Sequence, residues 1–248
     1  MFMFRKMTEF ILPRIIGVVL HKREILTKKE LAAQDAFMAK LDTKKCKTDK
    51  PVIVAVIGLV GSGKSSVAQE LAKHICATVI EGDDIRVELR KQSERYEKSR
   101  AIAENVAIEV VKKGGNVILD SDFVDEKKRA SVREKARKAG VRLVFVRTHC
   151  DLDVMVGRAL TATYHNRVDD FFGGAKSKWQ GSEQLKGAAV KVREMWRRTP
   201  HHYRWVNQGG GEWVLKRFLF AIFAEIDTTD SDSWKREVEK CAKQLLTQ

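Results

Sequence analysis

The stretch Gly58-Leu59-Val60-Gly61-Ser62-Gly63-Lys64-Ser65 decides the fold, because it matches the phosphate-binding pattern G-x-x-x-x-G-K-[ST] at every fixed position. An unbroken apolar, β-branched segment precedes it over 52–57, and this predicts a buried parallel strand. Apolar residues then recur at helical spacing up to Ile75, which predicts a helix directly after the loop. Strand, glycine loop and helix in this order are the context that the motif requires.

The chemistry of the loop explains its residue types. Glycines let the backbone turn sharply and bring its N–H groups close to phosphate oxygens, and the start of the following helix adds a favourable potential for an anion. Lys64 is expected to reach the β- and γ-phosphates of ATP, and the Ser65 hydroxyl to ligate Mg²⁺. The predicted nucleotide-binding residues are Gly58, Gly61, Ser62, Gly63, Lys64, Ser65 and Ser66. The motif alone leaves open whether the triphosphate serves phosphorylation, mechanical work or a switch.

The charge of the chain favours a polyanionic partner. The 248 residues contain 47 Lys and Arg against 33 Asp and Glu, a net charge of +14, and the excess is concentrated over 126–147 and 176–217. A basic surface attracts nucleic acid or highly phosphorylated small molecules. Each single run is equally compatible with the solvated face of an ordinary helix, so an anionic acceptor is a candidate and no more.

Cysteine usage and hydropathy predict a cytoplasmic protein. The four cysteines are widely spaced and form no C-x-x-C pair, so we expect all of them to be reduced thiols. The apolar run over 10–20 is interrupted by Pro13 and Arg14, which disfavours a signal peptide, and no transmembrane segment is expected.

The chain divides into an N-terminal helical extension with a linker, residues 1–50, and one larger domain, residues 51–248. Two amphipathic patterns over 11–20 and 26–41 predict short helices, which either dock on the core or bind a partner or membrane surface. The charged tract 43–51 ends in Pro51 and is typical of a linker.

Strands and helices alternate after the linker. Strands are expected over 52–57, 78–81, 116–120 and 141–146, with a fifth between 218 and 226. This alternation predicts an α/β fold of the P-loop NTPase type, a five-stranded parallel sheet with helices on both faces and ligands at the carboxyl ends of the strands. A lid is expected over about 161–185 and a hairpin around the triple glycine within 200–217.

Acidic side chains follow two of these strands. Asp83 is a candidate base that accepts the proton of an attacking hydroxyl. Asp84 is expected to cap a helix that begins at Ile85. Arg86, one turn further on, either binds an anionic group of the acceptor or faces solvent.

Asp120 ends an apolar strand and is the expected Mg²⁺ ligand, a role that the nearby Asp122 would share, unless both are ordinary turn carboxylates. Phosphoryl transfer also needs positive charge on the γ-phosphate. Arg158 and Arg167 are the candidates, at the edge of the lid and inside it.

Two other features admit a functional interpretation. His201-His202 has no partner cluster at ligand spacing, which disfavours a metal site. Tryptophans alternate with arginines over 196–213, an arrangement that stacks nucleic-acid bases in some proteins but also covers core edges.

The glycine loop, followed by Glu81-Gly82-Asp83-Asp84-Ile85-Arg86, resembles the P-loop kinase group of adenylylsulfate kinases, gluconate-type kinases and polynucleotide 5′-hydroxyl kinases. The resemblance implies that residues 51–248 form a kinase domain, that Asp83 activates the acceptor hydroxyl and that Arg86 binds an acceptor phosphate. Residues 117–123, with Arg129 downstream, and 151–158 are also similar to this group, and Arg129 is expected to face the acceptor site. The family often has a second lid arginine where this chain has Ala162.

Two functions follow from these features. The first is an ATP- and Mg²⁺-dependent kinase that phosphorylates a hydroxyl of an anionic acceptor, either a small metabolite or a nucleic-acid 5′ end. The second is a regulatory ATPase that uses the loop as a switch and has no dedicated acceptor. In that case Asp83 would have no task.

Overall fold

The computed structural model describes residues 24–164 and 182–247, and the expected helix over 11–20 and Arg167 lie outside these residues. The α-helices are α1 (Lys28–Lys40), α2 (Lys64–Ile75), α3 (Gly82–Lys91), α4 (Ser99–Lys112), α5 (Glu126–Ala139), α6 (Leu152–Thr161), α8 (Glu183–His202) and α9 (Trp234–Thr247). The strands are β1 (Val52–Ile57), β2 (Ala77–Glu81), β3 (Asn116–Asp120), β4 (Arg142–His149), β5 (Tyr203–Val206), β6 (Glu212–Leu215) and β7 (Ala224–Asp227). Two short 3₁₀ turns, η1 (Tyr96–Lys98) and η2 (Gln208–Gly210), complete the described elements.

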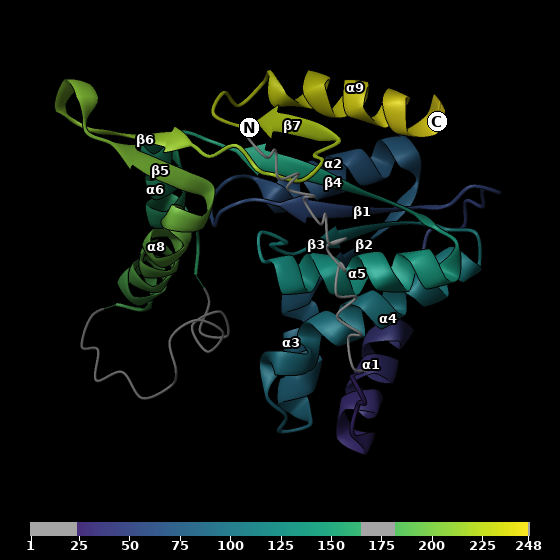
Figure 1. The fold of residues 1–248 in the computed structure, drawn as a ribbon. Coiled ribbons are helices and arrows are strands. Elements are labelled where there is room, and N and C mark those ends of the chain that lie inside the picture. Colours follow the sequence, from purple (N-terminus) through teal and green to yellow (C-terminus); the bar gives the residue numbers. More distant parts are fainter. Residues whose placement is uncertain (1–23, 165–181, 248) are drawn as a thin grey trace, which may run out of the picture.

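Five strands form one parallel sheet in the order β2-β3-β1-β4-β7. The central strand β1 pairs with β3 on one side and β4 on the other, so that Val54 lies between Ile118 and Val144. Helices cover both faces (Figure 1). The predicted fold class, an α/β P-loop fold with a five-stranded parallel sheet, is confirmed.

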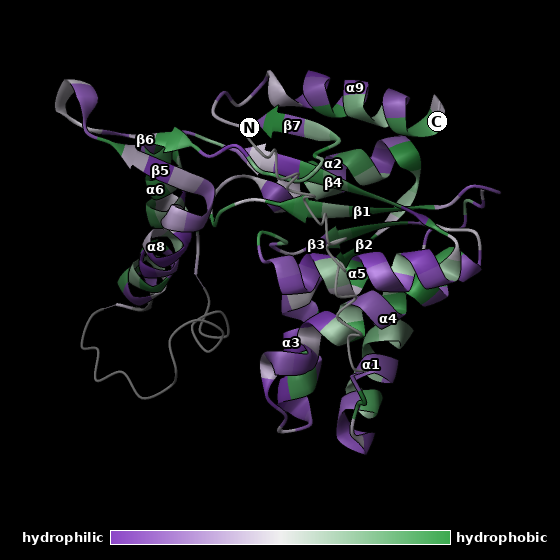
Figure 2. Cartoon of the chain, in the orientation of Figure 1, coloured by the Kyte–Doolittle hydropathy of each residue, from purple (hydrophilic) through white to green (hydrophobic). Residues whose placement is uncertain are grey.

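The alternation of side chains along β1 explains why both faces are buried. Ile53, Ala55 and Ile57 pack into the cluster formed with α1, α3, α4 and α5. The other side chains of β1 pack against α2 and α9. Because no residue of β1 faces water, the strand is apolar throughout, and Figure 2 shows hydrophobic strands between helices whose outer faces are hydrophilic.

The helix expected over 26–41 is present as α1, and it docks on the core. Thr27 and Glu30 form a capping box at its start. Ala33 and Phe37 are buried against the α3–α4 side of the sheet. Of the two alternatives for this part of the extension, the structure therefore has a packed helix.

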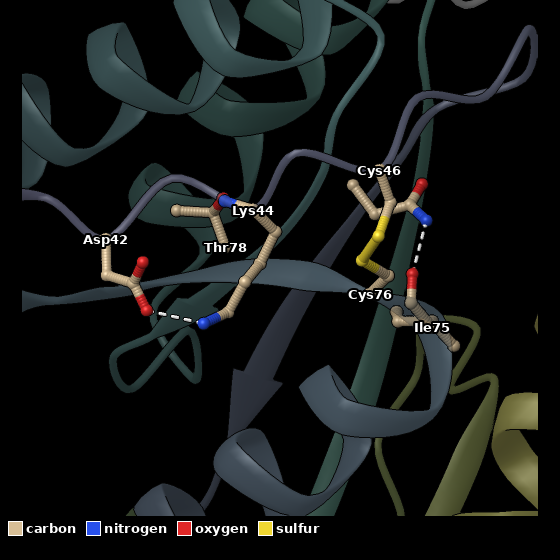
Figure 3. The surroundings of a disulfide bond; sticks show 7 residues. Asp42, Lys44, Cys46, Ile75, Cys76 and Thr78 are labelled. Carbon is tan, nitrogen blue, oxygen red and sulfur yellow. Dashed lines mark hydrogen bonds and ion pairs between the residues drawn. A yellow bond between two sulfur atoms is a disulfide. The ribbon is translucent and has the colours of Figure 1, made fainter.

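The expectation that all four cysteines are reduced is wrong for two of them, because Cys46 and Cys76 form a disulfide (Figure 3). The linker runs back along the start of β2, where the Lys44 backbone N–H donates to Thr78 Oγ1 at 3.1 Å. Cys46 thereby meets Cys76 at the C-cap of α2, although thirty residues separate them in sequence. Cys150 and Cys241 are free and buried.

Cys46→Ser is expected to lower the free energy of unfolding by about 3 kcal/mol, because the disulfide closes a loop of intermediate length in the unfolded chain. Urea unfolding of the variant and of the oxidised wild type measures the difference. Wild-type protein unfolded in reductant is the control and is expected to match the variant. Equal stability of oxidised wild type and variant would show that this bond contributes nothing.

Helix α8 was not expected. It spans 20 residues, begins after the N-cap Ser182, and includes Pro200 in its last turn. The predicted lid over 161–185 therefore lies mostly outside the described residues and runs into this helix. After α8, β5 and β6 pair antiparallel around the triple glycine. Helices α6 and α8 and this hairpin lie together at the left of Figure 1, beside the carboxyl ends of the central strands.

Across residues 24–164 and 182–247, no helix is both long and apolar enough to cross a membrane. The cytoplasmic location stays a prediction.

Candidate active site

The glycine loop connects β1 to α2 in a conformation that depends on its glycines. A Cβ at Gly58 would lie 2.1 Å from Thr148 Oγ1, so only glycine fits beside β4. Gly63 has a φ of 73°, a conformation that side chains disfavour, and it is the N-cap of α2. Since Gly63 has no side-chain oxygen to bond the first N–H groups of α2, these donors face the loop and suit a phosphate.

The predicted nucleotide-binding side chains surround this loop. Lys64 Nζ donates to the Leu59 carbonyl at 3.0 Å, so it lies across the loop. Ser62 is fully buried and its Oγ is 2.8 Å from Thr148 Oγ1, so its side chain is held inside the protein and does not face the loop opening. Ser65 and Ser66 are exposed in the first turn of α2. A loop with uncapped N–H groups, a lysine and a hydroxyl fits a Mg²⁺-bound triphosphate.

Arg158 of α6 contacts both the glycine loop and the segment that follows β7. Its guanidinium donates to the Gly61 carbonyl at 3.3 Å and to Thr228 Oγ1 at 3.1 Å. Thr228 Oγ1 in turn is within 3.1 Å of the Ser62 carbonyl. The predicted contact of Arg158 with the γ-phosphate stays a prediction, as does the role of Arg167.

Helix α3 begins directly at the end of β2. Glu81 is the N-cap and Gly82 the first helical residue, so the expectation that Asp84 caps a helix starting at Ile85 is wrong. The reason is that the strand passes into the helix without a turn, which places Asp83 and Asp84 in the first helical turn, where carboxylates are favourable. Asp83 is half exposed and pairs with Arg86 one turn later.

Four carboxylates gather where β2 and β3 end. Glu81 is directly opposite Asp120 in the parallel ladder. Burial raises the pKa of Glu81, and the nearby charges of Asp120, Asp84 and Asp83 raise it further. Burial and the charge of Asp83 likewise raise the pKa of Asp84. The predicted Mg²⁺ ligand Asp120 is one of these carboxylates, and its role as a ligand stays a prediction.

Asp122 connects β3 to α8. Its Oδ2 lies 3.2 Å from His202 Nε2 and 3.5 Å from Arg198 NH1, and all three residues are largely buried or half-buried. Burial alone would raise the pKa of Asp122, but the hydrogen bond from His202 and the charges of His202, Lys64 and Lys128 outweigh burial and lower the pKa to about 2. The carboxylate of Asp122 is therefore occupied by contacts that hold α8 in place. The structure does not support the expectation that Asp122 also binds Mg²⁺.

Helix α8 presents a polar stripe to the carboxyl ends of the strands. Lys191, Glu194, Arg198 and His202 recur at spacings of three and four residues, which places them on one face of the helix. Burial lowers the pKa of Lys191, the charge of Asp83 opposes this, and the charges of Lys64 and Arg86 lower it further. The loop lysine, the candidate base and Arg86 are therefore all close enough to act on one side chain of α8.

Arg129 does not face the acceptor side, contrary to expectation. Its guanidinium is buried, donates to the Phe123 carbonyl at 2.9 Å and lies 3.8 Å above the ring of Phe220. These contacts hold the loop after β3, so Arg129 has a structural role.

Sequence reasoning missed the contributions of α8 and of Lys128. The spacing of the α8 stripe, Lys191, Glu194, Arg198 and His202, was the available signal. Among the described residues no group of three or more His, Cys, Asp and Glu side chains could hold a metal ion. Trp196 and Trp205 both lie near Trp213, at ring distances of 6.4 and 5.5 Å, and Trp213 packs against the cluster under the hairpin.

Comparison with known proteins agrees with this geometry. The AAA_33 family model, described as an AAA domain, matches residues 53–170. The adenylyl-sulfate kinase of Bacillus velezensis is 29% identical over 168 residues, which are 62% of this chain and 84% of that protein. The probable adenylyl-sulfate kinase of Bacillus subtilis is 28% identical over 171 residues, 64% of this chain and 85% of that protein. The crystal structure of APE1195 superposes with a TM-score of 0.53 at 18% identity, over 82% of this chain and 98% of that one, and so shares the fold.

These findings confirm the predicted resemblance to the P-loop kinase group. The matched family model and the named kinases support a phosphotransferase of the P-loop type, and their likeness favours ATP with Mg²⁺ as its cofactors.

Proposed function

We propose that the protein transfers the γ-phosphate of ATP to a hydroxyl of an anionic acceptor, and that this acceptor is of the adenylyl-sulfate class. The observation that carries the proposal is that the glycine loop with Lys64 and the Asp83–Arg86 ion pair follow strands β1 and β2 of one parallel sheet, so that both lie at the carboxyl edge of that sheet. The named activity of the Bacillus relatives supports the choice of acceptor.

Each residue has a defined task in the transfer. Asp83 accepts the proton of the attacking hydroxyl, while Arg86, paired with it, orients the carboxylate. The acceptor oxygen then forms a bond to the γ-phosphorus, the bond from that phosphorus to the bridging oxygen breaks, and ADP leaves. Lys64 stabilises charge on the transferring group. Mg²⁺, held by Ser65 and Asp120, would neutralise the β- and γ-phosphate oxygens.

The test is acceptor-stimulated turnover. We expect ATP consumption to rise when adenylyl sulfate is added, with ADP and phosphorylated acceptor formed in equal amounts. A 5′-hydroxyl oligonucleotide and gluconate, assayed in parallel, cover the other acceptors of the P-loop kinase group. Slow ATP hydrolysis that no acceptor stimulates would favour the regulatory ATPase and contradict the proposal.

A further inference from the structure

A groove with a volume of about 770 Å³ follows the outer edge of β4. Strand β7 pairs with β4 only from Val146 onward, so the first half of β4 has no strand on that side among the described residues. The groove is bounded by α5, by the segment over 221–223 that leads into β7, and by Gln244 of α9. It lies at the amino half of β4, whereas the glycine loop lies at the carboxyl ends of the strands, so the groove is separate from the candidate active site.

The floor of this groove is apolar and its rim is polar. The apolar lining includes Val141, Leu143, Phe145, Ile222 and Phe223, and several of these side chains are only partly buried at the border of the cluster on the α5 side. The arginines at the rim already have partners, since Arg133 pairs with Glu126 at 3.1 Å and Arg137 with Glu134 at 3.0 Å. Half-exposed apolar side chains beside a core are typical of a surface that a further segment covers. The groove therefore suits an apolar chain segment better than an anion.

The chain itself contains such a segment. The run over 10–20 consists mainly of aliphatic and aromatic residues, with Pro13 and Arg14 as its interruptions. It is much shorter than the roughly 20 apolar residues that a membrane-spanning helix needs. Because apolar side chains that face water cost free energy, a run of this kind is stabilised by any apolar surface within its reach.

The described part of the chain begins close to the groove. Glu24 is ion-paired with Arg100 and, at 3.6 Å, with Lys98. Arg100 also donates to Ser131 Oγ of α5 at 2.7 Å, so Glu24 lies where α4 meets α5. The groove residue Arg133 is two positions further along α5, and helical geometry places it on the other side of that helix.

The residues before Glu24 are long enough to cross α5. A helix with its side chains is about 10–12 Å wide, and four extended residues span about 13 Å. The tract over 20–23 therefore suffices to bring the apolar run from the α4 side of α5 to the groove.

We propose that the run over 10–20 crosses α5 and docks in the groove, where its apolar side chains cover the outer edge of β4 and the segment over 221–223. The N-terminal extension then acts within its own chain, through α1 on the α3–α4 side and through the run beyond α5. The docking does not depend on the identity of the acceptor, because the groove lies away from the glycine loop and Asp83.

Hydrogen exchange of the full chain, followed by mass spectrometry, tests the docking. We expect the amides of 10–20 to exchange more slowly in the protein than in a synthetic peptide of residues 1–23. Ala221→Glu places a charge in the groove at an exposed position, so it spares the core. It should accelerate exchange over 10–20 by at least about tenfold, since losing an apolar contact lowers the free energy of local opening. Ala221→Trp fills the groove with a ring, should have the same effect, and keeps the test valid if Ala221→Glu does not fold.

Leu219→Glu is the matched control. Leu219 is fully exposed in the same segment and does not line the groove, so the same charge there should leave exchange over 10–20 unchanged. Ile16→Asp alters the run itself and should accelerate its exchange. The double variant with Ala221→Glu should exchange no faster than the faster single variant, because both changes remove one contact.

Exchange over 10–20 in the wild type that is as fast as in the free peptide would overturn the docking. Slow exchange that Ala221→Glu and Ala221→Trp both leave unchanged would overturn it as well. If the run becomes protected only when vesicles of phosphatidylcholine and phosphatidylglycerol are added, it binds a membrane surface and the proposal fails.

Discussion

Lys64→Ala is expected to lower the rate of phosphoryl transfer by at least about a hundredfold, because preorganised positive charge at the transferring group is worth about that much or more. The side chain lies across the glycine loop in this structure, with Nζ bonded to the Leu59 carbonyl, and no other lysine belongs to the loop. Loss of its charge also removes a contact with the bound triphosphate. Steady-state transfer rates and equilibrium binding of an ATP analogue measure the two effects.

Lys73→Ala is the matched control for this variant. Lys73 is exposed on the same helix, α2, and pairs with Glu70, so its loss removes the same charge at a distance from the loop. We expect near wild-type transfer from Lys73→Ala. A Lys64→Ala protein that folds, binds the analogue and transfers phosphate at the wild-type rate would show that the loop does not act as described.

Asp83→Ala is expected to lower transfer by about 10²- to 10⁴-fold, the range that a positioned general base contributes. ATP binding should be spared, because Asp83 belongs to the first turn of α3 and not to the glycine loop. The comparison variant is Asp84→Ala, which removes the adjacent carboxylate from the same turn. Transfer rates and ATP-analogue affinities of both variants show which of the two aspartates acts as the base.

If Asp84→Ala lost more activity than Asp83→Ala, the base would be assigned to the wrong residue. If Asp83→Ala weakened ATP-analogue binding as much as transfer, the carboxylate would serve the nucleotide instead of the acceptor hydroxyl.

The sheet could be predicted from the sequence because its strands are buried on both faces. Val52–Ile57 and Asn116–Asp120 have the expected bounds, since a strand between two layers of helices must be apolar at nearly every position. The nucleotide side of the site could be predicted equally well, because the loop residues are contiguous in sequence and adopt a conformation that glycines specify. Asp83 and Asp120 became candidates because Asp83 lies just after a strand and Asp120 ends one.

The acceptor side could not be predicted in the same way, because it depends on segments that fold back from far along the chain. His202 meets Asp122 across eighty residues, and nothing local to either residue indicates the pairing. Pro200 concealed the last turn of α8, because a proline inside a helix usually ends or kinks it, whereas α8 continues to His202. The Cys46–Cys76 disulfide was missed for the same reason, since the course of the linker along β2 is a property of the tertiary fold.

The most direct test of the central claim is transfer of labelled γ-phosphate from ATP to adenylyl sulfate by the wild type and by Asp83→Ala. The account predicts labelled acceptor and ADP in equal amounts from the wild type, and at least about a hundredfold less of both from Asp83→Ala at unchanged affinity for the ATP analogue. Label released only as inorganic phosphate by the wild type, or transferred equally well by both proteins, would contradict it.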